Sequence, residues 1–444
     1  MRQAWTWLAV LVLCVAGVNC SSPELEVAVE VPVVDPVEIP AEVPVEAADE
    51  VEVEELRSPK PLSDEQASRE DERKWQDGYW PFSAALYRSL AAQEPGNLFF
   101  SPYSINVLLA MMIDGAEGET RAEIVRALDV DADTDVPAVL RTLQRSRSEE
   151  DTDDPVLRVH SSIWAQQGSW ISPDYLDGLA ENFDAGVQLI DFAQGERAAR
   201  EINQWTAKAT EGAIDKIVEG SDFSRLTRAL LLNVTRFEDR WKEPFDEAET
   251  KDRPFHRLDG TTVSVPMMHQ ETELQYWSTD SYEAVIAEYE RRGSMVLLLP
   301  KPGRFREVDS RLSFELLAAI EESEDYGTYD VELTVPRIRF RSKLDLMEAL
   351  RGLGIERAFI PTVAEFERIA PGDLYLGKVA QNAELTIDEE GTRATAVTQG
   401  KFLDLGGGPE GTKTLTFDRP FLLLIIDEDL TRPLFIGRIV DPSG

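Results

Sequence analysis

Residues 385–399 read Leu-Thr-Ile-Asp-Glu-Glu-Gly-Thr-Arg-Ala-Thr-Ala-Val-Thr-Gln, a strand-forming run that passes through Gly391 into small residues. In an extended chain alternate side chains face the same way, so Thr392, Ala394, Ala396 and Thr398 share one uniformly small face. Such a segment is suited both to an exposed loop and to a place between existing strands, where bulky or charged side chains would clash or lose their water. The alternative interpretation is a flexible surface loop between two strands.

The residues that follow this segment support an exposed position. Gly406-Gly407-Gly408-Pro409 excludes a regular helix or strand, and the apolar strand-like run 421–427 begins soon afterwards. We therefore expect a long exposed loop that joins two strands.

Working outward, helical periodicity gives way to strand-like runs along the chain. Apolar residues recur at helical spacing in residues 79–92, 104–113 and 119–128. Apolar or β-branched runs of strand length follow at 156–164, 228–234, 295–299, 331–341 and 421–427. Helices first and strands later predict an α+β fold in one large domain, residues 75–444.

Composition excludes several classes of function. The 444 residues carry 83 acidic and 45 basic side chains, a net charge of −38, which makes nucleic-acid binding untenable. Both cysteines, Cys14 and Cys20, lie in the first twenty residues, so the large domain has no thiol for a disulfide, a metal or a nucleophile.

The amino terminus has the features of an export signal followed by a tether. Residues 4–18 form an apolar run after Arg2, which is too short to span a membrane. We interpret residues 1–20 as a signal peptide, with Cys20 either lipidated, as in a bacterial lipoprotein, or lost or left free after ordinary cleavage. Residues 21–74 hold 17 acids, 5 bases and frequent prolines, which predicts a disordered tether that is a spacer from a surface or merely solubilising.

No catalytic motif is present. The chain lacks a Gly-x-Ser-x-Gly elbow, a His-Glu-x-x-His helix, a phosphate-binding loop and a dinucleotide fingerprint. Its three histidines are scattered, and residues 129–140 depart from a calcium loop at Thr134 and Leu140. We expect neither an enzyme nor a cofactor or metal site.

Blocks of sequence across residues 75–442 resemble the serpins, the family of suicide protease inhibitors. The matching blocks include residues 97–105, 115–120, 202–205, 232–246, 335–338, 353–359, 389–392, 418–421 and 433–438. The resemblance implies a serpin fold, with a large central sheet, smaller sheets and a reactive-centre loop at about residues 389–416. Its hinge would comprise Glu389, Glu390, Gly391 and Thr392, followed by Ala394, Ala396 and Thr398.

The same resemblance implies a mechanism. A serine protease cleaves the loop, and the loop then inserts into the central sheet before the acyl-enzyme is hydrolysed, which traps a covalent complex. Thr395 and Val397 depart from the usual residues but lie on the opposite face. The alternative within the family is a non-inhibitory carrier or binding protein.

Two ways of counting place the cleaved bond differently. Counting forward from Gly391 gives Leu405-Gly406, whereas counting back from Phe417 gives Pro409, because the loop is four residues longer than usual. We favour Leu405-Gly406, with Phe402 and Leu403 as alternatives. These apolar residues indicate a chymotrypsin-, elastase- or subtilisin-like target, although Lys401 leaves a trypsin-like target open.

Further positions match the region where the sheet opens in the family. They are Ser101, Ser104, Asn233, Gln381 and Trp241. Gln381 stands where a histidine is common, so a pH-sensitive gate is not expected there. Arg141, Arg145 and Arg147 match a heparin-binding helix, but the acids at 149–151 argue against a heparin-like activator. We expect an exported monomer, extracellular or on the cell envelope, with membrane contact only through a lipid on Cys20.

Overall fold

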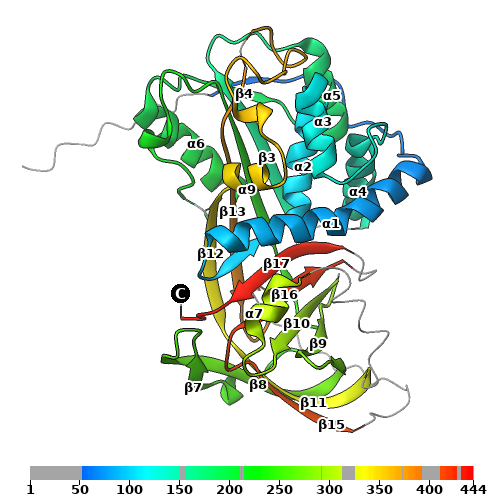
Figure 1. The fold of residues 1–444 in the computed structure, drawn as a ribbon, viewed down its shortest axis with the longest axis vertical. Helices are drawn as coiled ribbons and strands as arrows, with labels where there is room; N and C mark the ends of the chain where they lie inside the picture. The colour runs from blue at the N-terminus through cyan, green and yellow to red at the C-terminus, as the bar shows by residue number, and fades with distance from the viewer. Residues whose placement is uncertain are drawn as a thin grey trace, which may run out of the picture. The chain divides into compact units, whose positions relative to one another are not determined.

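The computed structural model describes residues 53–150, 157–210, 212, 215–291, 293–312, 326–372, 374–392, 411–427 and 432–443. All of them belong to the compact unit Val51–Gly444. Two large sheets and a set of helices make up this unit, which confirms the predicted α+β class (Figure 1).

Sheet A has the strand order β1-β4-β3-β5-β13-β14-β6, and β12 pairs with β13 outside this path. Its strands are β1 (Glu54–Leu56), β3 (Leu157–Gln166), β4 (Val187–Ile190), β5 (Ala229–Phe237), β6 (Asp239–Arg240), β12 (Ile338–Asp345), β13 (Leu376–Ile387) and β14 (Gly391–Thr392). β5 and β13 are parallel neighbours, from Ala229 opposite Leu376 to Thr235 opposite Ala383. The seam between these two strands lies below the short strand β14.

Sheet B has the order β15-β11-β8-β9-β10-β16-β17-β2, with β7 paired to β8. Its strands are β2 (Leu98–Phe100), β7 (Lys251–His256), β8 (Thr262–Ser278), β9 (Tyr282–Glu288), β10 (Ser294–Pro300), β11 (Gly327–Pro336), β15 (Thr412–Thr416), β16 (Phe421–Ile426) and β17 (Pro433–Ile439). β10 and β16 are buried along their whole length, which explains their unbroken apolar sequences. The resemblance implied smaller sheets beside sheet A, whereas these strands form one nine-stranded sheet.

Among the described residues, the α-helices are α1 (Arg69–Gln93), α2 (Pro102–Ile113), α3 (Gly118–Ala127), α4 (Val136–Glu150), α5 (Pro173–Phe183), α6 (Gly195–Ala209), α7 (Phe305–Ser310) and α9 (Met347–Gly352). α2 is buried on every side, and it packs on β5 of sheet A and on β17 of sheet B. It begins at Pro102, and the preceding Ser101 caps it by accepting a hydrogen bond from the Ser104 backbone N–H. The start of α2 is thus fixed directly beneath sheet A.

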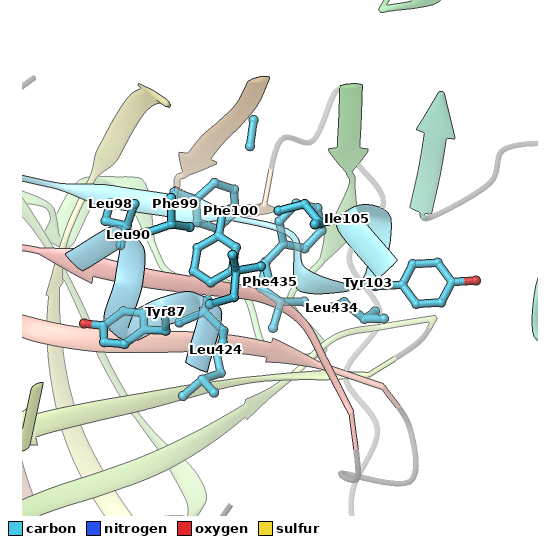
Figure 2. Packing of buried hydrophobic residues seen from close by; sticks show 14 of the residues in the cluster. Tyr87, Leu90, Leu98, Phe99, Phe100, Tyr103, Ile105, Leu424, Leu434 and Phe435 are labelled. Carbon is cyan, nitrogen blue, oxygen red and sulfur yellow. The ribbon is translucent and has the colours of Figure 1, made fainter. Parts of the chain in front are cut away.

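The main core extends from sheet B, past α1 and α2, to sheet A. Figure 2 shows Phe99 and Phe100 of β2 beside Phe435 of β17, and the rings of Phe99 and Phe435 stack 4.9 Å apart. Tyr87 and Leu90 cover them from α1. Burying each such ring stabilises the fold by about 2 kcal/mol. A second cluster, which includes Trp164, Phe192 and Ile202, fills the space between sheet A and α6.

The predicted tether is wrong at its C-terminal end. Residues 53–68, here called the N-terminal strap, lie on the domain, and β1 within them pairs with the edge strand β4. α1 begins ten residues before the predicted Tyr79, because Ser68 caps it by accepting a hydrogen bond from the Asp71 backbone. The acidic, proline-rich composition predicted disorder, but residues 53–68 are ordered because they contact the folded domain.

The predicted strand 331–341 is two strands in different sheets. β11 pairs with β8 in sheet B, and β12 pairs with β13 in sheet A. The chain crosses between the sheets at Pro336-Arg337, where proline has no N–H to continue a ladder. The C-terminal part of the predicted loop is also regular, since Thr412–Thr416 forms β15.

Candidate functional site

The hinge is a tight turn at the end of β13. The Asp388 N–H donates to the Gly391 carbonyl (3.0 Å), and the Asp388 carboxylate accepts from the backbone N–H groups of Glu390 (3.1 Å) and Gly391 (3.2 Å). Burial raises the pKa of Asp388, and these two donors partly offset that rise. A Cβ on Gly391 would lie 2.2 Å from the Asp239 carbonyl oxygen, so only glycine fits this approach.

β14 is already seated in sheet A. Thr392 pairs with Ile387 of β13 on one side and with Asp239 of β6 on the other. Its side chain is 2% exposed, and its hydroxyl lies 2.7 Å from the hydroxyl of Tyr289. The first residues of the small-faced segment thus occupy the position of a new strand.

An aromatic platform supports the turn. The rings of Trp241 and Tyr289 stack 4.8 Å apart, and the Trp241 indole N–H donates to the Asp388 carbonyl (2.9 Å). The backbone N–H groups of Trp241 and Phe245 donate to the carbonyls of Glu390 and Glu389, each at 2.9 Å. Trp241 therefore binds the turn through both its indole N–H and its backbone N–H.

The Glu389 carboxylate binds Arg337, which lies where the chain crosses from β11 to β12. Nε of Arg337 donates to both carboxylate oxygens (2.7 and 2.8 Å), and the Thr250 hydroxyl donates a third hydrogen bond. Burial alone would raise the pKa of Glu389, but these donors lower it below its ordinary value. The hinge thus starts from an anchored, ionised carboxylate.

Below the hinge, a polar cluster spans the seam between β5 and β13. Gln381 of β13 lies directly opposite Asn233 of β5, and both are fully buried. The Gln381 amide donates to the Asn233 side-chain oxygen (3.0 Å) and to the Ser104 hydroxyl (2.7 Å). The Ser101 backbone donates to the Gln381 side-chain oxygen (3.1 Å). Buried hydrogen bonds therefore cross the seam at Gln381, and the start of α2 completes them.

β15, at the C-terminal end of the predicted loop, belongs to sheet B. β15 pairs in parallel with β11, from Thr412 opposite Asp330 to Thr416 opposite Thr334. The Lys413 ammonium lies over the rings of Tyr276 (4.7 Å) and Tyr329 (4.6 Å). The two ends of the predicted loop are thus held by different sheets.

The structure brings together Ser101, Ser104, Asn233 and Gln381 at the seam, and Trp241, Glu389, Glu390, Gly391 and Thr392 at the hinge. The remaining predicted site residues lie outside the described residues. They are Cys20, Ala394, Ala396, Thr398, Phe402, Leu403, Leu405, Gly406 and Pro409.

Sequence reasoning missed several residues that hold this region. Tyr289 and Thr250 contact the hinge, and the Ser161 hydroxyl accepts a hydrogen bond from the Asn233 side chain (3.0 Å). All three come from segments distant in sequence, and no local pattern singles them out. Arg337 lies in a block that was recognised, but its ion pair with Glu389 could not be foreseen from spacing.

Taken together, these elements define an α+β protein whose sheet A holds Gly391 and Thr392, the first residues after the turn at Asp388. The family model "Serpin (serine protease inhibitor)" matches residues 79–442. Alpha-1-antiproteinase S of Cavia porcellus is 31% identical over 374 residues, which cover 82% of this chain and 89% of that protein.

Solved structures agree. The thermophilic serpin tengpin in its native state is 25% identical with a TM-score of 0.75, over 87% of this chain and 97% of that one. Thyroxine-binding globulin complexed with thyroxine is 27% identical with a TM-score of 0.73, over 84% of this chain and all of that one.

The chain belongs to the serpin family. Members of this family are in general protease inhibitors and not enzymes, they form complexes with target proteases, and they are largely secreted. Within the part of the chain that the structure describes, no helix is long and apolar enough to cross a membrane.

Proposed function

We propose that this protein is a suicide-substrate inhibitor of serine proteases that traps its target by inserting residues 391–405 into sheet A. The observation that carries the proposal is β14, because Thr392 already pairs with both flanking strands. Continued pairing would require β5 to part from β13, whose backbone groups would then bond to the new strand.

The chemical step would occur at Leu405-Gly406. The protease serine oxygen would attack the Leu405 carbonyl carbon, the bond to the Gly406 nitrogen would break, and the serine proton would pass to that nitrogen. The Leu405 ester would then face either hydrolysis by water or removal by insertion. Inhibition requires insertion to be the faster event.

The proposed target has an apolar specificity pocket, as in chymotrypsin-, elastase- or subtilisin-like proteases. Leu405, Phe402 and Leu403 support this choice. Residues 75–444 carry a net charge of −27, so a basic protease would be steered toward the domain. Rising salt should slow that association because it screens the attraction.

A protease panel tests the proposal. The full chain is mixed with chymotrypsin-, elastase-, subtilisin- and trypsin-type enzymes, and covalent complexes are sought after boiling in detergent. Mass spectrometry should find a cut after one of residues 401–409, with Leu405 expected. Absence of a complex across the whole panel would refute inhibition.

The similarity to thyroxine-binding globulin favours one alternative, a carrier that binds a small ligand without trapping a protease. Cleavage of the loop separates the two functions. An inserting serpin should unfold at a much higher temperature after cleavage, whereas equal midpoints for cleaved and intact protein would support a carrier.

For localisation, we propose export directed by residues 1–20 and lipidation of Cys20. The charge pattern of the leader and the Gly17-Val18-Asn19 sequence before Cys20 support this proposal. Labelling with a radioactive fatty acid should mark the wild-type chain and leave Cys20→Ala unlabelled.

A further inference from the structure

The N-terminal strap extends sheet A beyond its outer edge. β1 pairs with β4 in antiparallel register, with Glu54 opposite Leu189, Glu55 opposite Gln188 and Leu56 opposite Val187. An edge strand presents a row of N–H and C=O groups that can accept a further strand. In this protein the chain itself supplies that strand.

Both faces of the sheet receive an apolar side chain of the strap. Val53 packs against the second cluster, beneath α6, whereas Leu56 packs against the main core. Alternate residues of a strand face opposite ways, so a three-residue spacing places these two side chains on opposite faces. The strap therefore packs on both faces of sheet A at the β4 edge.

Gly186, directly before β4, leaves space for the strap. A Cβ there would lie 2.7 Å from the Leu56 carbonyl oxygen, 2.8 Å from a Glu55 carboxylate oxygen and 3.1 Å from the Arg57 Cβ. All three atoms belong to the strap. The close approach at Gly186 is thus specific to this segment.

After β1, the strap crosses α5 through polar contacts. The buried Ser58 hydroxyl donates to the Asp177 carboxylate (2.6 Å), and the Lys60 ammonium pairs with Asp177 (3.1 Å) and Glu181 (3.0 Å). The Ser63 N–H donates to the Glu181 carbonyl (2.9 Å). These bonds fix the direction of the strap toward α4.

On α4, two arginines of the segment that matches a heparin-binding helix hold the strap. Nε and Nη2 of Arg141 donate to the Glu65 carbonyl (3.1 and 2.8 Å), and Arg145 donates to the Ser63 carbonyl (2.9 Å). The Arg141 side chain is only 6% exposed. The Arg141 guanidinium is therefore buried and bonded to the strap, which leaves it unsuited to binding a sulfated polysaccharide. This is a second reason, besides the neighbouring acids, to expect no heparin-like activator.

The strap connects elements on the two sides of the seam between β5 and β13. Its β1 end lies on β4, which belongs to the β4-β3-β5 side of sheet A. Its other end runs into α1, which packs against α9, and α9 packs on β13. α1 also packs on α2 and α4. The strap therefore opposes a parting of β5 from β13 in which β4 and α5 move relative to α1.

We propose that the surface formed by α4, α5 and β4 is a binding surface for an extended peptide strand, that residues 53–68 fill it, and that their binding restrains insertion into sheet A. This inference rests on the proposed function, because insertion is the movement that the strap opposes. With the strap bound, the uninserted form persists; with the strap released, the loop inserts without a protease.

The first experiment uses the full chain with Gly186→Ala. Hydrogen exchange should show lost protection of residues 53–68, and a heat-resistant inserted form should appear about tenfold faster during warm incubation, as followed by electrophoresis across a urea gradient. Gly96→Ala is the matched control, since a Cβ there meets no atom within 4 Å, and it should stay within about twofold of wild type.

The second experiment locks the strap. Glu55→Cys with Gln188→Cys places two thiols opposite each other in the β1–β4 pair. The oxidised protein should convert about tenfold more slowly than the same protein after reduction, because release is prevented. Equal rates in the two redox states would overturn the proposal.

The outcomes separate this inference from the proposed function. If Gly186→Ala keeps its strap protected, or loses protection and converts at the wild-type rate, the strap proposal is wrong. If wild type forms no covalent complex with any protease, the proposed function fails, whereas the exchange and urea measurements still read the effect of the strap.

Discussion

Replacing Thr392 with arginine puts a guanidinium where a buried hydroxyl now lies between β13 and β6. Thr392 is 2% exposed, and its hydroxyl lies 2.7 Å from the Tyr289 hydroxyl. Tyr289 offers no charge to pair with arginine, because burial raises the pKa of its phenol well above 10 and keeps it neutral. We expect Thr392→Arg to be cleaved without trapping the protease.

The size of the effect follows from the burial. The effective penalty for an unpaired buried ion is several kcal/mol. If about 4 kcal/mol opposes entry of the hinge, insertion slows by about a thousandfold, since each 1.4 kcal/mol is tenfold. Hydrolysis of the acyl-enzyme then wins. Thr392→Val keeps the size but leaves the Tyr289 hydroxyl unpaired, which costs about 1 kcal/mol and slows insertion about fivefold.

The assay titrates a fixed amount of a protease that the wild type inhibits. The number of inhibitor molecules consumed per trapped protease should rise more than about a hundredfold for Thr392→Arg and modestly for Thr392→Val. Thr392→Ser keeps the hydroxyl and serves as the control. An unchanged ratio for Thr392→Arg would refute the insertion argument.

Three further predictions concern the hinge, the seam and a buried acid. Gly391→Ala should displace β14, because its Cβ would meet the Asp239 carbonyl at 2.2 Å, and hydrogen exchange at Thr392 should accelerate while the fold persists. Asn233→Ala should lower the free energy of unfolding by about 3 kcal/mol, because buried donors around it lose their acceptor; unfolding in urea measures this, and a loss below about 1 kcal/mol would contradict the network. Burial, and to a lesser extent repulsion from Asp135, raise the pKa of Asp114 from 3.8 to about 6. The fold therefore favours the protonated acid, and this contribution is lost as pH rises through 6, so Asp114→Asn should stabilise the protein at pH 7.5 by up to about 3 kcal/mol and by little at pH 4.

Much of the fold could be predicted from local patterns. The helices at 104–113 and 119–128 were placed within two residues of α2 and α3, since apolar periodicity and capping act within a few turns. The strand 331–341 could not be divided correctly, because β11 and β12 have similar propensities and differ only in the partners that they meet. Strand pairing is non-local, and sequence pattern does not specify it.

The sequence predicted a hinge before the small face that begins at Thr392, and the structure places Thr392 within sheet A. Its supports were not predicted. Tyr289 stacks on Trp241 and Arg337 pairs with Glu389 only because distant strands converge there. The strap was predicted to be disordered, because its acidic composition carries no information about its binding partners. Those partners are the edge strand β4 and the arginines of α4.

The sequence alone determined the family, the class of fold and the small face that begins at Thr392, because motif order, periodicity and side-chain size are properties of the chain itself. Only the tertiary structure decided that β14 is already seated, that buried hydrogen bonds cross the seam below it, and that residues 53–68 bind the sheet edge. Each of these depends on pairing between segments more than a hundred residues apart, where the contact surface exists only after the chain has folded.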